Sequence, residues 1–83
     1  MGSFRVDEIF SIEGRGIALI GQCVEGEISL GMQALINAKQ AKIVGIETNN
    51  SEQERASVGQ DIAVIVNSIT KDDPVAGQSY AFG

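Results

Sequence analysis

Eighty-three residues, 43% of them hydrophobic and 20% charged, are enough for one small folded domain and argue against a disordered chain. The net charge of −5, with six Lys and Arg set singly along the chain, argues against duplex nucleic acid as the main partner. We therefore predict a single domain over residues 1–83. Met1, Gly2 and Ser3 are given no weight, because such a tripeptide could be a cloning remnant.

The chain carries no targeting signal that we can identify. No apolar run approaches the roughly 18 residues of a membrane-spanning helix, and the N-terminus has neither the basic nor the apolar region of a signal peptide. We expect a cytoplasmic protein that has no membrane partner. The single cysteine, Cys23, lies in an apolar run and cannot form an internal disulfide, which indicates a buried and unreactive thiol.

Turn residues recur at short intervals, which predicts short elements separated by tight connections. The segments between them are rich in β-branched and aromatic residues. We predict six strands: Phe4–Ile12, Ile17–Val24, Gln33–Ile36, Lys42–Glu47, Ile62–Ile69 and Ser79–Phe82. The polar segment 51–58 is predicted to be a single helical turn or an ordered loop.

So many strands in a short chain would leave open edges unless the sheet closes on itself. The sequence therefore predicts an all-β fold, a small closed six-stranded antiparallel barrel. Gly21, inside a predicted strand, fits a bulge or a tight bend where the barrel turns a corner. Residues 62–66 are apolar on both faces of their strand, which predicts an inner face in the core and an outer face covered by a neighbouring segment.

The residues needed for catalysis are nearly absent. The chain has no histidine, so nucleophilic triads and zinc sites are excluded in their usual forms. Gly26 and Gly31 have the spacing of a phosphate-binding loop, but Met32 and Gln33 stand where Lys and Ser or Thr must contact phosphate and magnesium. We predict that the protein is not an enzyme, and that it has no catalytic residues and no cofactor.

Two pairs of carboxylates, Glu25 with Glu27 and Asp72 with Asp73, remain to be explained. Neither pair has further ligands at a recognised metal-binding spacing, so we predict no metal site. The simplest interpretation is that they keep strand ends and turns soluble.

A Gly-Arg-Gly corner at Gly14, Arg15 and Gly16 joins the first two predicted strands, and its glycines permit the positive φ of a tight hairpin. The surrounding FSIEGRGIALIGQCVEGEISLG resembles the opening hairpin of the β-barrel second domain of translation GTPases, elongation factor Tu above all. KIVGIE, AxxGQDIAVIVNSI and DDPVAGQ resemble later strands and loops of that domain, in the same order. The resemblance spans roughly Phe4–Phe82, and it implies a translation-protein β-barrel with Greek-key-type connections.

In elongation factor Tu this barrel forms part of the pocket for the terminal adenosine of aminoacyl-tRNA. By resemblance, Glu47 matches the glutamate that accepts a hydrogen bond from the ribose, a contact that distinguishes RNA from DNA. Ala18 stands where the family often has valine, and Ile65 where it often has leucine. The matching positions in this chain are Ile12, Gly14, Ala18, Glu47, Asp61 and Ile65.

Other positions depart from the family pattern. Asp61 replaces an asparagine that helps to hold the aminoacyl group, and Asn49 and Asn50 replace longer or basic side chains. An added carboxylate and a missing cation should weaken binding to a negatively charged RNA end.

The same residues have plainer interpretations, which stay open at this point. Ile12, Ala18 and Ile65 alternate with other residues as barrel core residues would, and the glycines of the corner are explained by turn geometry. Glu47 is equally well read as a solvated carboxylate at the end of a strand. Arg15 is expected to pair with an acidic neighbour on the surface.

Three functions are compatible with these observations. The 83 residues contain no GTPase domain of the family, so the resemblance implies no nucleotide hydrolysis. We expect first a non-catalytic interaction module that binds a protein partner or itself, because the surface that meets the GTPase domain in the intact factors would otherwise be exposed. The second expectation is a module that binds an RNA 3′ end, and the third is an excised piece of a longer translation GTPase.

Overall fold

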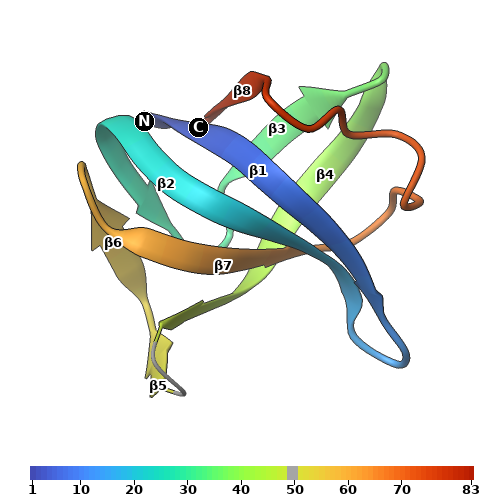
Figure 1. The fold of residues 1–83 in the computed structure, drawn as a ribbon, viewed down its shortest axis with the longest axis horizontal. Coiled ribbons are helices and arrows are strands. Elements are labelled where there is room, and N and C mark those ends of the chain that lie inside the picture. The colour runs from blue at the N-terminus through green and yellow to red at the C-terminus, as the bar shows by residue number, and fades with distance from the viewer. Residues whose placement is uncertain (49–50) are drawn as a thin grey trace.

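The computed structural model, which describes residues 1–48 and 51–83, is one antiparallel sheet curled into a barrel (Figure 1). Six strands form its wall: β1 (Gly2–Ile12), β2 (Gly16–Ser29), β3 (Gln33–Ile36), β4 (Lys39–Thr48), β7 (Asp61–Val66) and β8 (Ser79–Phe82). They follow one another around the barrel in the order β3-β4-β7-β2-β1-β8. Between β8 and β3, the backbones of Gln33 and Gly83 exchange two hydrogen bonds of 2.9 Å, so the barrel is nearly closed. The predicted all-β, six-stranded antiparallel barrel is confirmed.

The predicted helical turn or loop at 51–58 is wrong, because two short strands lie there: β5 (Ser51–Gln53) and β6 (Arg55–Ser57). β5 pairs with the end of β4, and β6 pairs with the end of β2. Each long strand extends past its partner on one edge, β4 past β3 and β2 past β7, and the free backbone groups there pair with a polar segment as readily as with an apolar one. Ala56 is buried in the core, which fixes β6 in place.

Inward-facing side chains form one apolar core. Along β2 the core residues Ile17, Leu19 and Cys23 alternate with residues that face outward, and β7 repeats the pattern at Ile62, Val64 and Val66. Cys23 is fully buried, as the sequence predicted. Among the described residues there is no helix long and apolar enough to cross a membrane.

The predicted bulge beside Gly21 is confirmed. The register of β1 on β2 slips between Val6 and Glu8, so Asp7 has no direct partner. A Cβ atom at Gly21 would collide with the backbone oxygen of Arg5. The two strands approach each other more closely here than a side chain would permit, and the barrel bends at this point.

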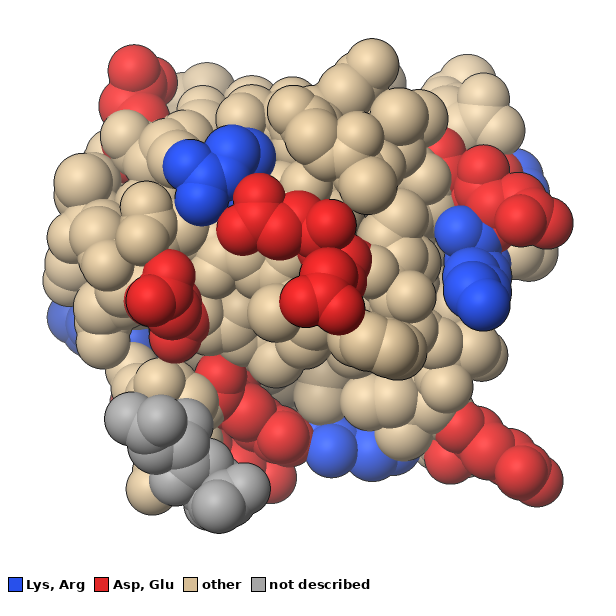
Figure 2. All heavy atoms as spheres, viewed as in Figure 1, with Lys and Arg blue, Asp and Glu red and all other residues tan. Residues whose placement is uncertain are grey.

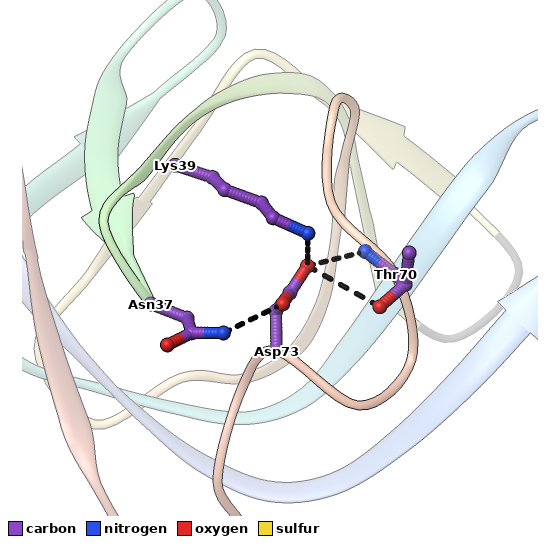
Figure 3. Close-up of polar contacts among 4 residues, drawn as sticks. All are labelled: Asn37, Lys39, Thr70 and Asp73. Atoms are coloured by element: carbon purple, nitrogen blue, oxygen red, sulfur yellow. Dashed lines mark hydrogen bonds and ion pairs between the residues drawn. The ribbon is translucent and has the colours of Figure 1, made fainter.

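Asp73 is buried, so the interpretation that both acidic pairs only keep strand ends and turns soluble is wrong for this residue. Figure 3 shows its polar contacts. One carboxylate oxygen accepts hydrogen bonds from the Thr70 amide at 2.7 Å and from Lys39 Nζ at 2.9 Å, and the other accepts from Asn37 Nδ2 at 2.9 Å. These bonds, the Thr70 amide above all, hold the pKa of Asp73 well below its ordinary value. Asp73 therefore fastens the long β7–β8 connection to the β3–β4 turn.

Gly2 and Ser3, which the sequence led us to set aside as a cloning remnant, are part of the wall. Gly2 pairs with Gly26 of β2 and with Phe82 of β8, and it is buried. Strand β1 thus begins two residues before the predicted Phe4.

Candidate functional site: the outer face of β1, β2, β7 and β4

The strand register places the predicted site on the outside of the barrel. Residues paired on neighbouring strands point to the same face of the sheet. Across β1, β2, β7 and β4 the outward residues form three rows: Arg5, Gln22 and Asp61; Glu8, Ile20, Ala63 and Glu47; Phe10, Ala18, Ile65 and Gly45. We call this set the outer face. It lies toward the viewer in Figure 1, where β7 and β2 cross the front of the barrel.

Four of the six residues singled out by resemblance lie on the outer face: Ala18, Glu47, Asp61 and Ile65. Ile12 lies at the margin of this face, half-buried at the end of β1 and opposite Gly16. Gly14 is exposed in the β1–β2 turn at a φ of 81°, and a Cβ atom built on it has no neighbour within 4 Å. The geometry of Gly14 is that of a hairpin turn, as the plainer interpretation proposed.

Ala18 and Ile65 are neither core residues of the barrel nor the walls of an open pocket. They point away from the interior and do not belong to its apolar cluster, yet only 3% and 1% of their surface is exposed. The prediction that residues 62–66 are covered on their outer face is confirmed at Ile65, whereas Ala63 is only half-buried.

Arg15 provides part of that cover. Its Nη2 atom lies 2.7 Å from Glu47 Oε2 in an ion pair across the outer face. A Cβ atom at Gly45 would lie 3.3 Å from both Arg15 Nη2 and Ile65 Cδ1, so the guanidinium lies over the glycine and beside the isoleucine. The predicted pairing of Arg15 is confirmed, and the carboxylate that resembles a ribose ligand already has a cationic partner.

Asp61 lies at the far edge of the outer face. Gln22 Nε2 donates a hydrogen bond of 2.9 Å to Asp61 Oδ1, and Thr48 Oγ1 donates to the Asp61 backbone oxygen at 3.3 Å. These contacts keep a negative charge beside Ala63, where an anionic ligand would be repelled. The departures at Asn49 and Asn50 lie outside the described residues.

The electrostatic field of the outer face is negative. Both arginines are already bonded: Arg15 to Glu47, and Arg5 Nε to Asp7 Oδ1 at 2.9 Å. The Arg5–Asp7 hydrogen bond raises the pKa of Arg5 and lowers that of Asp7. Glu8 and Asp61 add exposed carboxylates, and Figure 2 shows acidic side chains gathered across the middle of this view.

Sequence reasoning missed two residues of this face, Phe10 and Gly45. Phe10 is 51% exposed although it begins the row that contains Ala18 and Ile65. Phe10 directly follows Ile9, which packs against the core, so the two-residue period of β1 turns Phe10 to the outside. Gly45 leaves the room that the Arg15 guanidinium occupies, and that role requires knowledge of the register.

Other parts of the described chain show weaker candidates for a binding site. A hollow of about 210 Å³ beside the N-terminus is lined by Met1, Gly2, Ser3, Glu25 and Ala81 and includes none of the predicted site residues. Within residues 1–48 and 51–83, no three His, Cys, Asp or Glu side chains lie close enough to hold a metal ion.

Comparison with known proteins finds the same kind of barrel in elongation factors. No family model matches the chain. Over 74 residues, 87% of the chain, it is 31% identical to elongation factor 1-alpha of Pyrobaculum calidifontis. The crystal structure of a bacterial selenocysteine-specific elongation factor, EF-Sec, superimposes on 95% of the chain with a TM-score of 0.82 at 21% identity. The chain is an elongation factor Tu domain 2-like β-barrel.

The elongation factor Tu domain 2-like barrel matches only part of each relative. It spans 17% of the length of elongation factor 1-alpha and 14% of the EF-Sec chain. The likeness therefore concerns the barrel, and the activities of the complete factors do not follow from it.

Proposed function

We propose that this domain 2-like barrel is a non-catalytic, cytoplasmic binding module that holds another protein on its outer face. The observation that carries the proposal is the exposure of Phe10 at the start of a row whose next members, Ala18 and Ile65, are already covered. An aromatic side chain that is half-exposed on the outside of a sheet beside apolar neighbours is typical of the anchor of a protein interface.

The absence of histidine from the sequence supports a binding role over a catalytic one. The carboxylates of the outer face that have partners form hydrogen bonds or ion pairs with Arg5, Arg15 and Gln22, contacts that serve structure. If the 83 residues are one part of a longer factor, the protein that is bound would be a neighbouring domain of the same polypeptide.

The test is site-specific photo-crosslinking in the source organism. A benzophenone amino acid replaces Phe10 in one variant and Val75 in a matched control, because Val75 has nearly the same exposure, 50%, on the connection between β7 and β8. The proposal predicts a discrete crosslink from position 10, to a second protein or to a neighbouring domain of the same polypeptide, and none from position 75. Equal crosslinking at both positions, or none at position 10, would contradict it.

A second candidate function is binding of an RNA 3′ end, the expectation that comes with the resemblance. The observation in its favour is that Ala18, Glu47 and Ile65 share one face. Two features of the structure argue against RNA binding. Arg15 already forms an ion pair with the Glu47 carboxylate, and Ala18 and Ile65 offer almost no exposed surface for a base to stack on.

Titration of the ¹⁵N-labelled protein with a short RNA that ends in CCA, and with the same sequence as DNA, separates the two functions. RNA-specific shifts at Glu47 and Ile65 would favour the second candidate over the first. The same titration of the Arg15→Ala variant is the more sensitive test for RNA binding, because this substitution removes the cation that is paired with the Glu47 carboxylate. No shifts in either protein would eliminate the RNA function.

A further inference from the structure

The charge and shape of the outer face indicate the chemistry of its occupant. We infer that the occupant is a cationic protein segment that places an apolar side chain on Phe10 and basic side chains against the surrounding carboxylates. The inference rests on the proposed function and adds the class of partner to it.

Carboxylates outnumber arginines on and around the outer face. Asp7, Glu8, Glu13, Glu47 and Asp61 are opposed by two arginines, each bonded to one of these carboxylates, and by the exposed Lys42 of β4 at the margin of the face. Exposed charges act on a partner over a Debye length of about 8 Å at physiological salt, so neighbouring carboxylates on this face attract the same cationic segment together.

The same charges argue against the other occupants. A second copy bound through the same face would form a two-fold contact and place these carboxylates opposite their own copies. A nucleic acid would bring phosphates to a surface on which carboxylates outnumber cations and both arginines are already paired. A cationic protein segment is the occupant that this field attracts.

The apolar residues at the centre give the segment something to pack on. Ile20 and Ala63 are half-buried in the middle of the row that begins at Glu8 and ends at Glu47, and Phe10 stands beside them. This row has apolar surface in its centre and carboxylates at its ends. It is therefore complementary to a segment that has an apolar centre and basic side chains at its ends.

The spacing of the row suggests the spacing of the basic residues. Glu8 and Glu47 lie at opposite ends of a row that crosses four strands, β1, β2, β7 and β4. Three strand spacings of about 4.8 Å give roughly 14 Å, the length of about four residues of an extended chain. We therefore expect basic residues about four positions apart with an apolar residue between them. The exposed Arg15–Glu47 pair is weak enough, at most about 1 kcal/mol, for a second cation to share or replace it.

The experiment uses a blocked octapeptide with Lys or Arg at that spacing and Leu between them, added to the ¹⁵N-labelled protein. A peptide with Glu in place of every basic residue is the charge control. We expect shifts centred on Glu8, Phe10, Ile20 and Ala63 with the basic peptide alone. Binding should weaken about 10-fold when the salt concentration rises from roughly 50 to 500 mM.

Matched variants test the two parts of the inference. Phe10→Ala should weaken peptide binding at least about 5-fold, whereas Leu35→Ala, at a position 66% exposed on β3, should leave it within about 2-fold. Glu8→Gln with Asp61→Asn should flatten the salt dependence. The control variant Glu54→Gln with Asp72→Asn changes the net charge by the same amount and should leave the salt dependence of binding unchanged. The dispersion of each spectrum shows that the variant is folded.

The outcomes separate the inference from the proposed function. Equal binding of both peptides, or self-association that Phe10→Ala abolishes, would overturn the inference that the occupant is a cationic segment. Failure of both peptides alongside a specific crosslink at position 10 would also overturn it while leaving the protein-binding function in place. Failure of both peptides without that crosslink would remove the two proposals together.

Discussion

Leu19 offers a direct test of the barrel interior, because the chain supplies a matched control for it. Leu19 lies on β2 between Ile9 of β1 and Val64 of β7 and is fully buried. Leu35, on β3, is 66% exposed. Substitution of either residue by alanine removes the same three carbon atoms, so the two variants differ in burial and in little else.

The expected magnitudes follow from that burial. Removing three buried carbons costs about 2.4 kcal/mol of transfer free energy, and incomplete collapse of the cavity raises the cost to roughly 3–4 kcal/mol for Leu19→Ala. Leu35→Ala should change the free energy of unfolding by less than about 1 kcal/mol. A domain of 83 residues has a total stability of roughly 4–12 kcal/mol, so the first variant loses a large part of it.

Urea unfolding followed by far-ultraviolet circular dichroism measures both variants, and the slope with urea shows whether unfolding stays two-state. The melting temperature of Leu19→Ala should fall by about 12 °C or more, since 1 kcal/mol corresponds to roughly 4–8 °C in a domain of this size. Similar losses in the two variants would refute the assignment of Leu19 to the interior and of Leu35 to the surface.

Three further predictions concern single contacts. Because the folded pKa of Asp73 is lowered, its carboxylate stabilises the fold above the ordinary pKa of about 3.9 and loses this effect as pH falls toward the folded pKa. The stability gap between the wild type and Asp73→Asn should therefore narrow from pH 5 to pH 3 in urea titrations; a gap that widens would contradict this. Gly21→Ala should destabilise the barrel by about 1–3 kcal/mol, because its methyl group collides with the Arg5 backbone; an unchanged unfolding midpoint would rule out the close approach. Arg15→Ala should destabilise the fold by about 1–2 kcal/mol, because it removes a partly exposed ion pair with Glu47 and uncovers Ile65; unchanged thermal melts would contradict the cover that Arg15 provides.

The wall strands of the barrel, its bulge and its first hairpin could be predicted from local patterns. Runs of β-branched residues between turn residues indicated the six wall strands, and Gly21 in such a run indicated the bulge. The Gly-Arg-Gly corner indicated the first hairpin. These features depend on backbone preferences of residues near one another in the chain, so the sequence alone contains them. The two short strands β5 and β6 escaped prediction, because their pairing depends on edges that distant strands provide.

The candidate site was predicted only as a set of residues. A two-residue period shows which side chains of a strand share a face, and for residues 62–66, apolar on both faces, it does not show which face is the interior. The register across β2, β7 and β4 decided that Ala18 and Ile65 point outward. It also brought Arg15 over Gly45 and onto Glu47.

Asp73 shows the same division between local and distant causes. The sequence determined that it lies in a turn-rich connection next to a proline, a local property of the chain. Its burial depends on Asn37 and Lys39, 36 and 34 residues away, whose side chains replace the water that a carboxylate otherwise requires. The sequence by itself thus determined the strands, turns and barrel class of this protein. The tertiary structure decided which charges are paired and which side chains are covered, because those properties arise only when distant segments meet.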